Sequence, residues 1–242
     1  MLNEPWNSTV APADLFRQTY VAHVPEPARR YLAHAIRPGT PLASAVRLRM
    51  RGSIKIGRWV RFEAEQVIRA DRGFMWAARV PFLKIPLIRG FDRLVDGAGE
   101  MRWKLFGILP VMSASGRDIT RSAVGRMEAE SLWLPTMLMR GDVRWTAGDE
   151  RHAIATFRDS HNSIHFAVDD EGRLTSVSLQ RWGNPDGRAF RLIDFGGRIE
   201  AERTFDGYTI PSRVRVGWYF GTPRFETEGE FFRATIDHAT FK

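Results

Sequence analysis

The sequence lacks cysteine altogether, in a chain of 242 residues. This absence excludes disulfides, thiol nucleophiles and thiolate metal sites. The chain also lacks any stretch of the roughly 20 apolar residues that a membrane-spanning helix requires. Its first residues have neither the basic nor the apolar segment of a secretory signal peptide. We therefore expect a cytoplasmic protein.

The signatures of nucleotide-binding and hydrolytic enzymes are missing as well. There is no Walker motif and no His-Glu-x-x-His arrangement. Ser113-Ala114-Ser115-Gly116 is not the Gly-x-Ser-x-Gly elbow of hydrolases. Gly97-Ala98-Gly99 lacks the third glycine of a dinucleotide fingerprint. We predict no cofactor, and the catalytic residues of any reaction stay unknown from motifs.

A metal site is not predicted either. His161 and His165 lie four positions apart, with Asp159 and Asp169 nearby. On an extended strand this spacing separates the two histidines by roughly 13 Å, too far for one ion. Both also fall on the polar face of their segment, so we expect a solvated pair.

The composition indicates a folded globular protein with a basic surface. Hydrophobic residues make up 43% and charged residues 26% of the chain, which is the balance of a packed domain. Lysine and arginine total 36 against 28 acidic residues, a net charge of +8 that favours anionic partners. The positive charge is spread along many segments, and no nucleic-acid-binding motif occurs, so nucleic acid is not an expected partner. We expect one domain, residues 1–242.

Hydrophobic periodicity divides the chain into four parts. Residues 9–37 repeat apolar residues at helical spacing in two short runs, and 115–134 do so again in the middle of the chain. Residues 44–106 and 142–237 alternate apolar and polar residues, as strands do. Roughly ten or eleven strands joined by short turns exceed what a flat sheet accommodates. We predict a mainly β (α+β) fold: a strongly curved antiparallel sheet or open barrel, with N-terminal helices and the mid-chain helix covering the concave face.

Two proline-broken apolar runs fit neither period. They are Pro81–Ile88 and Leu105–Met112. One interpretation is a cavity mouth or a rim that touches an anionic membrane through these runs together with Lys84, Arg89 and Lys104. The other is a pair of buried loops, and the pattern leaves both open.

Candidate site residues follow from the side of each strand on which they fall. Arg181 and Arg203 fall on the apolar side, where a guanidinium requires an acidic partner or an anionic ligand. An ion pair with Glu128, Glu130 or Asp194, or a strand bulge that shifts the register, would explain them without a ligand. The candidate ligand-binding residues are Trp76, Trp103, Trp133, Arg181, Arg203, Trp218 and Tyr219. Glu128 is the candidate general acid or base.

Three groups of residues are similar to a known family. Pro25–Leu32, Glu130–Thr136 and Gly207–Ser212 with Val216–Thr222 resemble an uncharacterised bacterial family, a domain of unknown function. The resemblance extends over nearly the whole chain from about residue 24 and implies no established activity. The order of elements is also similar to the curved-sheet architecture of lipoprotein carriers such as LolA and LolB, a likeness of fold that supplies no function by itself.

These patterns leave three hypotheses for function. The first is binding of a hydrophobic or amphipathic small molecule, lipid-like with an acidic head group, in a cavity enclosed by the sheet. The second is a cofactor-independent enzyme, an isomerase or cyclase, that uses the same cavity. The third is a protein-interaction module. The oligomeric state cannot be predicted from the sequence.

Overall fold

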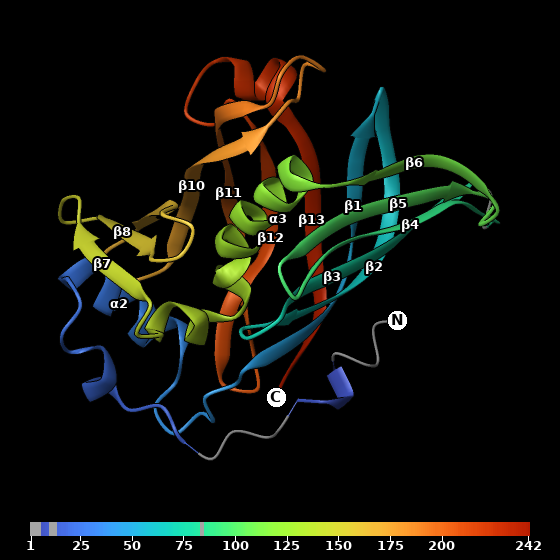
Figure 1. Ribbon diagram of the computed structural model, residues 1–242. Helices are drawn as coiled ribbons and strands as arrows, with labels where there is room; N and C mark the ends of the chain where they lie inside the picture. Colours follow the sequence, from blue (N-terminus) through green and yellow to red (C-terminus); the bar gives the residue numbers. More distant parts are fainter. Residues whose placement is uncertain (1–5, 10–13, 83–84) are drawn as a thin grey trace.

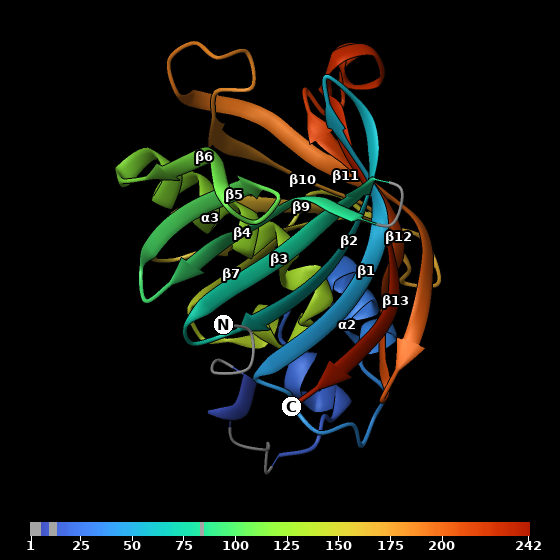
Figure 2. The same cartoon turned by 90° about the vertical axis from the view of Figure 1, so that its right-hand side faces the viewer.

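A computed structural model describes residues 6–9, 14–82 and 85–242 of the chain. Its main element is a 13-stranded antiparallel sheet that curves around two helices (Figures 1 and 2). The strands are β1 (Ala45–Ile56), β2 (Arg58–Arg69), β3 (Gly73–Phe82), β4 (Ile85–Val95), β5 (Ala98–Leu105), β6 (Leu109–Ser115), β7 (Val143–Ala147), β8 (His152–Phe157), β9 (Ser163–Val168), β10 (Leu174–Gly183), β11 (Arg191–Phe205), β12 (Tyr208–Trp218) and β13 (Glu230–Phe241). The predicted curved antiparallel sheet is confirmed.

The sheet consists of two meanders joined at one seam. The strand order is β6-β5-β4-β3-β2-β1-β13-β12-β11-β10-β9-β8-β7, so all neighbours except β1 and β13 are consecutive in the chain. Across the seam, Val46 pairs with Phe241 and Ile54 with Phe232. Because the first and last strands meet in the middle, β6 and β7 form the two outer edges.

Alternation places one side of each strand in the core. In β1, Val46, Leu48 and Met50 are buried, whereas Arg49 and Arg51 between and beyond them are exposed. The outward arginines pair with acidic residues of neighbouring strands, as Arg51 does with Asp237 at 2.9 Å. The concave face is therefore apolar, and the convex face carries rows of charged side chains.

The sheet has 13 strands instead of the predicted ten or eleven because the two proline-broken runs contribute β4 and β6. Their prolines lie where a missing N–H is tolerated: Pro86 is at the start of β4, beside a register shift in β3, and Pro110 is on the edge strand β6. Lys84 lies outside the described residues.

The connection between the outer edges explains the position of the mid-chain helix. After β6 the chain must reach β7 at the far edge, and α3 (Arg117–Ala129), η2 (Glu130–Trp133) and η3 (Pro135–Met139) carry it across the hollow side (Figure 1). Here α3 packs against β10 on one wing and β5 on the other. The prediction that this helix covers the concave face is confirmed.

The N-terminal segment is less helical than predicted. Of the two helices expected within residues 9–37, one is α2 (Glu26–Ala35), and the other is only a 3-10 turn, η1 (Gln18–Val21); residues 10–13 lie outside the described part. Helix α2 packs against β7, β8, β9 and β12. In the part of the chain that the structure covers, no helix has the length and apolar character to span a bilayer.

Candidate functional site

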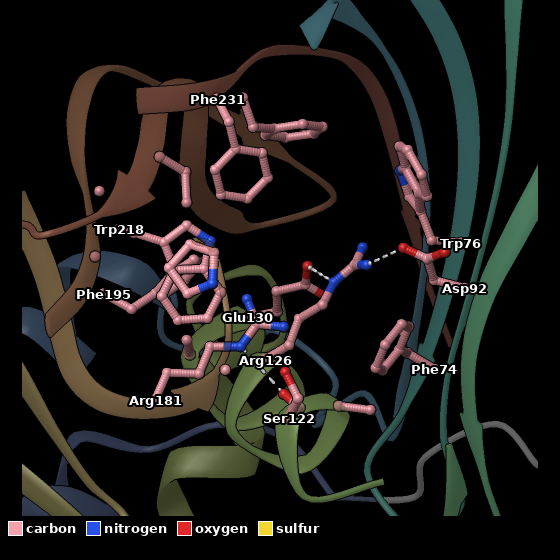
Figure 3. A pocket seen from close by; sticks show the side chains of 18 of the residues that line it. Phe74, Trp76, Asp92, Ser122, Arg126, Glu130, Arg181, Phe195, Trp218 and Phe231 are labelled. Carbon is pink, nitrogen blue, oxygen red and sulfur yellow. Dashed lines mark hydrogen bonds and ion pairs between the residues drawn. The ribbon is translucent and has the colours of Figure 1, made fainter. Parts of the chain in front are cut away.

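The concave face encloses a cavity of about 520 Å³ above α3 (Figure 3). One wall comes from β10 to β13 and carries Phe195, Trp218 and Phe231, and the opposite wall carries Phe74 and Trp76 of β3. The cavity opens beside the edge strand, because Met112 of β6 lines it and is 50% exposed.

Aromatic rings in contact with one another form most of the apolar wall. Phe195 and Trp218 meet edge to face with ring centroids 4.9 Å apart, and Trp76 meets Phe232 at 6.0 Å. Gly183 is required for this arrangement, since a Cβ there would lie 2.2 Å from Cη2 of Trp218. Such a wall favours an apolar or aromatic ligand.

The floor of the cavity carries an ion-pair cluster. Arg126 of α3 donates from Nη1 to Asp92 at 2.9 Å and from Nε to Glu130 at 2.8 Å. Trp103 donates to the other oxygen of Asp92 at 3.0 Å, and Gln66 donates to Glu130 at 2.5 Å. Burial alone would lower the pKa of Arg126, but the two carboxylates more than offset it and raise the pKa. Arg126 is therefore fully paired within the protein.

Arg181 of β10 differs from Arg126 in having no acidic partner. Its Nε donates to the carbonyl of Ser122 at 3.1 Å, and its guanidinium carbon lies 4.5 Å from the ring centre of Phe195 and 5.2 Å from that of Trp218. Across residues 6–9, 14–82 and 85–242, no carboxylate lies within ion-pair distance of it. Burial first, and then the charge of Arg126, lower the pKa of Arg181 to about 9, so the group is still charged at neutral pH.

One further polar atom in the wall is unpartnered. The indole Nε1 of Trp76 is buried and has no hydrogen-bond acceptor among the described residues. An indole N–H is a donor only. Because this atom has almost no accessible surface, an oxygen in the cavity does not reach it, and Arg181 is the position where a ligand oxygen would be most stabilising.

Four of the seven predicted ligand-binding residues line the cavity: Trp76, Trp133, Arg181 and Trp218. Trp133 donates to the carbonyl of Pro211 at 3.0 Å and forms part of the wall beyond α3. Trp103 is buried, 5.6 Å from Trp76 between ring centroids, but it does not line the cavity.

The predicted inward position of Arg203 is wrong. Its side chain is exposed, lies 5.0 Å from the ring of Phe205 and donates weakly to the carbonyl of Asp237. The cause is a register shift between Ile199 and Ala201, where β11 has one residue more than β12; a second shift, after Ala201, adds a residue to β12 instead. Such bulges turn the following side chains to the other face.

Tyr219 does not line the cavity either. It follows β12 in a turn, with a left-handed φ of 58°, and its ring is covered by the guanidinium of Arg224 at 3.8 Å. The turn therefore places the ring outside the ligand space.

Glu128 is buried but faces away from the cavity. It accepts a hydrogen bond from Asn162 Nδ2 at 2.6 Å, on the side of α3 toward β9. Burial raises the pKa of Glu128, while hydrogen bonds from Ser160 and Asn162 offset part of that effect. A general acid or base acting on a molecule in the cavity cannot be Glu128.

Sequence reasoning missed three polar or aromatic groups of the site. Asp92 lies on β4, which the pattern did not predict as a strand, and Phe195 precedes the predicted part of β11. Arg126 had a usable signal, because Glu130 follows it at the i,i+4 spacing of helical ion pairs.

The described residues contain no group of three or more potential metal ligands. His161 and His165 are both exposed, as predicted. The donors that line the cavity include the guanidinium groups of Arg126 and Arg181, which suit oxygen acceptors.

The sequence matches the model of a family of unknown function over residues 22–241. No curated protein matches it. The resemblance to an uncharacterised family, predicted from the three motif groups, is therefore confirmed.

Two solved structures are similar to the chain at the level of fold. A LolA superfamily protein from Nitrosomonas europaea is 11% identical, with a TM-score of 0.48 over 89% of this chain and 92% of that one. A DUF1329 family protein from Desulfovibrio piger is 10% identical, with a TM-score of 0.49 over 83% and 86% of the two chains. The Nitrosomonas europaea protein carries the name of LolA, whose architecture the predicted order of elements resembles.

Proposed function

This chain belongs to that family of unknown function, DUF6920, and we propose that it binds an amphipathic small molecule whose acidic head group contacts Arg181. The observation that carries the proposal is a guanidinium without a carboxylate partner, among the described residues, in the wall of an aromatic cavity. A buried cation in this state is stabilised by an anion that reaches it.

The size and surface of the cavity support a lipid-like body for the ligand. A volume of about 520 Å³ lies within the range of roughly 300–1,000 Å³ typical of small-molecule sites. The aromatic walls from β3 and from β10 to β13 bury apolar surface on two sides of the space.

Unsatisfied donors, and not net charge, recognise the head group. The charged residues that line the site balance formally, since there are three arginines, Arg93, Arg126 and Arg181, and three carboxylates, Asp92, Glu100 and Glu130. The carboxylates, however, are engaged by Arg126 and Arg93. The Nη atoms of Arg181 are left to bind a carboxylate or phosphate oxygen, and a charge-assisted hydrogen bond is about twice as strong as a neutral one.

Binding of a fluorescent polyene fatty acid and of the corresponding alcohol tests the proposal. We expect the wild type to bind the acid more tightly than the alcohol. Arg181→Met should lower the affinity for the acid by roughly 10- to 100-fold, to that for the alcohol. Arg203→Met is the matched control, because that arginine is exposed. Native mass spectrometry of the purified protein should also detect a co-purified acidic lipid-like molecule.

The stability of the same variant provides a second measurement. Because Arg181→Met removes a buried cation that has no acidic partner among the described residues, its free energy of unfolding should increase while acid binding weakens. Equal acid binding by Arg181→Met and Arg203→Met, or no binding by the wild type, would contradict the proposal.

The enzyme hypothesis is less well supported. Of the three groups considered for proton transfer, Glu128 and Tyr219 lie outside the cavity, and only Arg181 lines it. The carboxylates that line the cavity are paired with arginines, Asp92 and Glu130 with Arg126 and Glu100 with Arg93. We therefore propose binding alone.

A further inference from the structure

The hairpin between β5 and β6 has an apolar tip, which we define as Phe106, Ile108, Leu109 and Val111. These side chains are 58%, 76%, 58% and 54% exposed, respectively. The hairpin projects from the end of the sheet, at the right of Figure 1. Soluble domains rarely expose several large apolar side chains side by side unless that surface contacts a membrane or a partner.

The turn itself holds an aromatic residue in an unfavourable backbone conformation. Phe106 and Gly107 have φ of 52° and 73°, and Ile108 N–H bonds to the carbonyl of Leu105 at 3.0 Å. Turns with two left-handed central residues favour Asn-Gly or Asp-Gly. Two other hairpins of the chain use that pair, at Asp96-Gly97 and Asp206-Gly207.

The left-handed conformation is unfavourable for phenylalanine, because it brings Cβ close to the following carbonyl oxygen. In addition, most of the Phe106 side chain is in water, so packing within the protein does not offset this cost. Strain of this kind at an exposed position indicates a function for the side chain.

Two basic residues lie behind the apolar tip without acidic partners. Arg89 of β4 and Lys104 of β5 are directly opposite each other across the sheet, and both are exposed. Like charges in this position repel. In the part of the chain that the structure describes, neither has a carboxylate within ion-pair distance, whereas the nearby Arg93 and Arg102 both pair with Glu100. An anionic surface would stabilise the Arg89–Lys104 pair.

Strand addition by another protein fits this edge poorly. Pro110 has no N–H to offer to an added strand, and a register shift between Trp103 and Lys104 disrupts the regular ladder. A partner that presses on apolar side chains without needing backbone pairing fits better. A lipid bilayer is such a partner.

We propose that the apolar tip inserts into the interface of an anionic lipid bilayer, with Arg89 and Lys104 at the level of the head groups. The apolar tip lies farther out than the basic pair, just as the acyl chains of a bilayer lie deeper than its anionic head groups. The same edge continues to the cavity, because Met112 of β6 lines it. Membrane contact is independent of the proposed ligand, since the tip residues are not part of the cavity wall.

Flotation with lipid vesicles tests the proposal. We expect the wild type to bind vesicles of phosphatidylcholine with about 30% phosphatidylglycerol more tightly than pure phosphatidylcholine. Phe106→Asn should weaken that binding roughly tenfold or more. Asparagine tolerates the left-handed conformation, so this variant should be at least as resistant to thermal unfolding as the wild type. The charge variant Arg89→Gln/Lys104→Gln should lose most of the preference for anionic vesicles.

The control is Leu15→Ser, which removes an exposed apolar side chain from the N-terminal segment (49% exposed). It should bind vesicles as the wild type does. Failure of the wild type to float with anionic vesicles overturns the proposal. The same holds if the tip mediates self-association and the protein does not float. An equal loss in Leu15→Ser and Phe106→Asn overturns it as well.

Discussion

Glu128 and Glu130 are two positions apart, yet they lie in different surroundings. Glu130 faces the cavity and pairs with Arg126 at 2.8 Å, whereas Glu128 faces Asn162 and has no basic partner in the described part of the chain. The two residues therefore differ in their partners: Glu130 lies in an ion pair, and desolvation leaves Glu128 with a raised pKa.

This difference makes a prediction about pH. Because the pKa of Glu128 is raised in the folded state, its contribution to the free energy of unfolding is favourable at low pH. That contribution is lost as the pH rises from the ordinary value of 4.5 through the raised one. Glu128→Gln should therefore be more stable than the wild type at pH 7 and should lose this part of the pH dependence. Urea unfolding across that range measures it, with the exposed Glu171→Gln as a control that changes little.

Ligand binding should not change in Glu128→Gln, because the carboxylate lies outside the cavity. A variant with weakened fatty-acid binding and unchanged stability would contradict both the pKa argument and the placement of the residue.

At the scale of elements, α3 is the part that makes a cavity out of a curved sheet. It contacts β5 closely enough that Gly99 N–H bonds to Thr120 Oγ1 at 2.9 Å, and a Cβ on Gly99 would lie 2.6 Å from Cα of Thr120. On the other wing the approach is looser, since a Cβ on Gly125 would meet Leu179 and Arg181 at 3.5 Å. The helix backbone thus approaches β5 more closely than β10, which it contacts through side chains.

Two glycine variants test this asymmetry. Gly99→Ala forces two backbones apart and should lower the free energy of unfolding by about 1–3 kcal/mol. Gly125→Ala introduces an ordinary contact and improves helix propensity, so it should be neutral or stabilising by up to ~1 kcal/mol. Chemical denaturation measures both, and equal destabilisation by the two variants would show that α3 is clamped from both sides.

At the scale of the whole molecule, stability should decrease from the seam toward the edges. β1 and β13 are paired on both sides and carry buried residues such as Leu48 and Ile236. β6 has one neighbour, and nearly all of its side chains are exposed. Local opening at β6 therefore breaks few contacts.

Hydrogen–deuterium exchange should show this gradient. We expect amides of β1, β12 and β13 to exchange only with global unfolding and those of β6 to exchange orders of magnitude faster. Addition of anionic vesicles should slow exchange in the β5–β6 hairpin and leave β1 unchanged. A uniform exchange rate across the sheet would contradict the gradient.

The sequence predicted those features that depend on local pattern. Alternation of Val46, Leu48 and Met50 with arginines indicates a strand whichever neighbour it has, because the period of two is a property of the backbone. The same rule placed Arg181 on the inner face correctly. It failed for Arg203, because the bulge in β11 shifts the register without any mark in the composition.

Strand number, partner choice and the cavity were decided by the tertiary structure. Prolines kept β4 and β6 from being predicted as strands, and the missing N–H groups are tolerated only because of where these prolines lie in the sheet. Whether Arg181 meets a carboxylate depends on Asp92 and Glu130 being taken by Arg126, and those groups are brought together from β4, α3 and η2. Local preferences act over a few residues and can be read from the chain, whereas an unfilled space and an unpaired charge result from distances between elements remote in sequence.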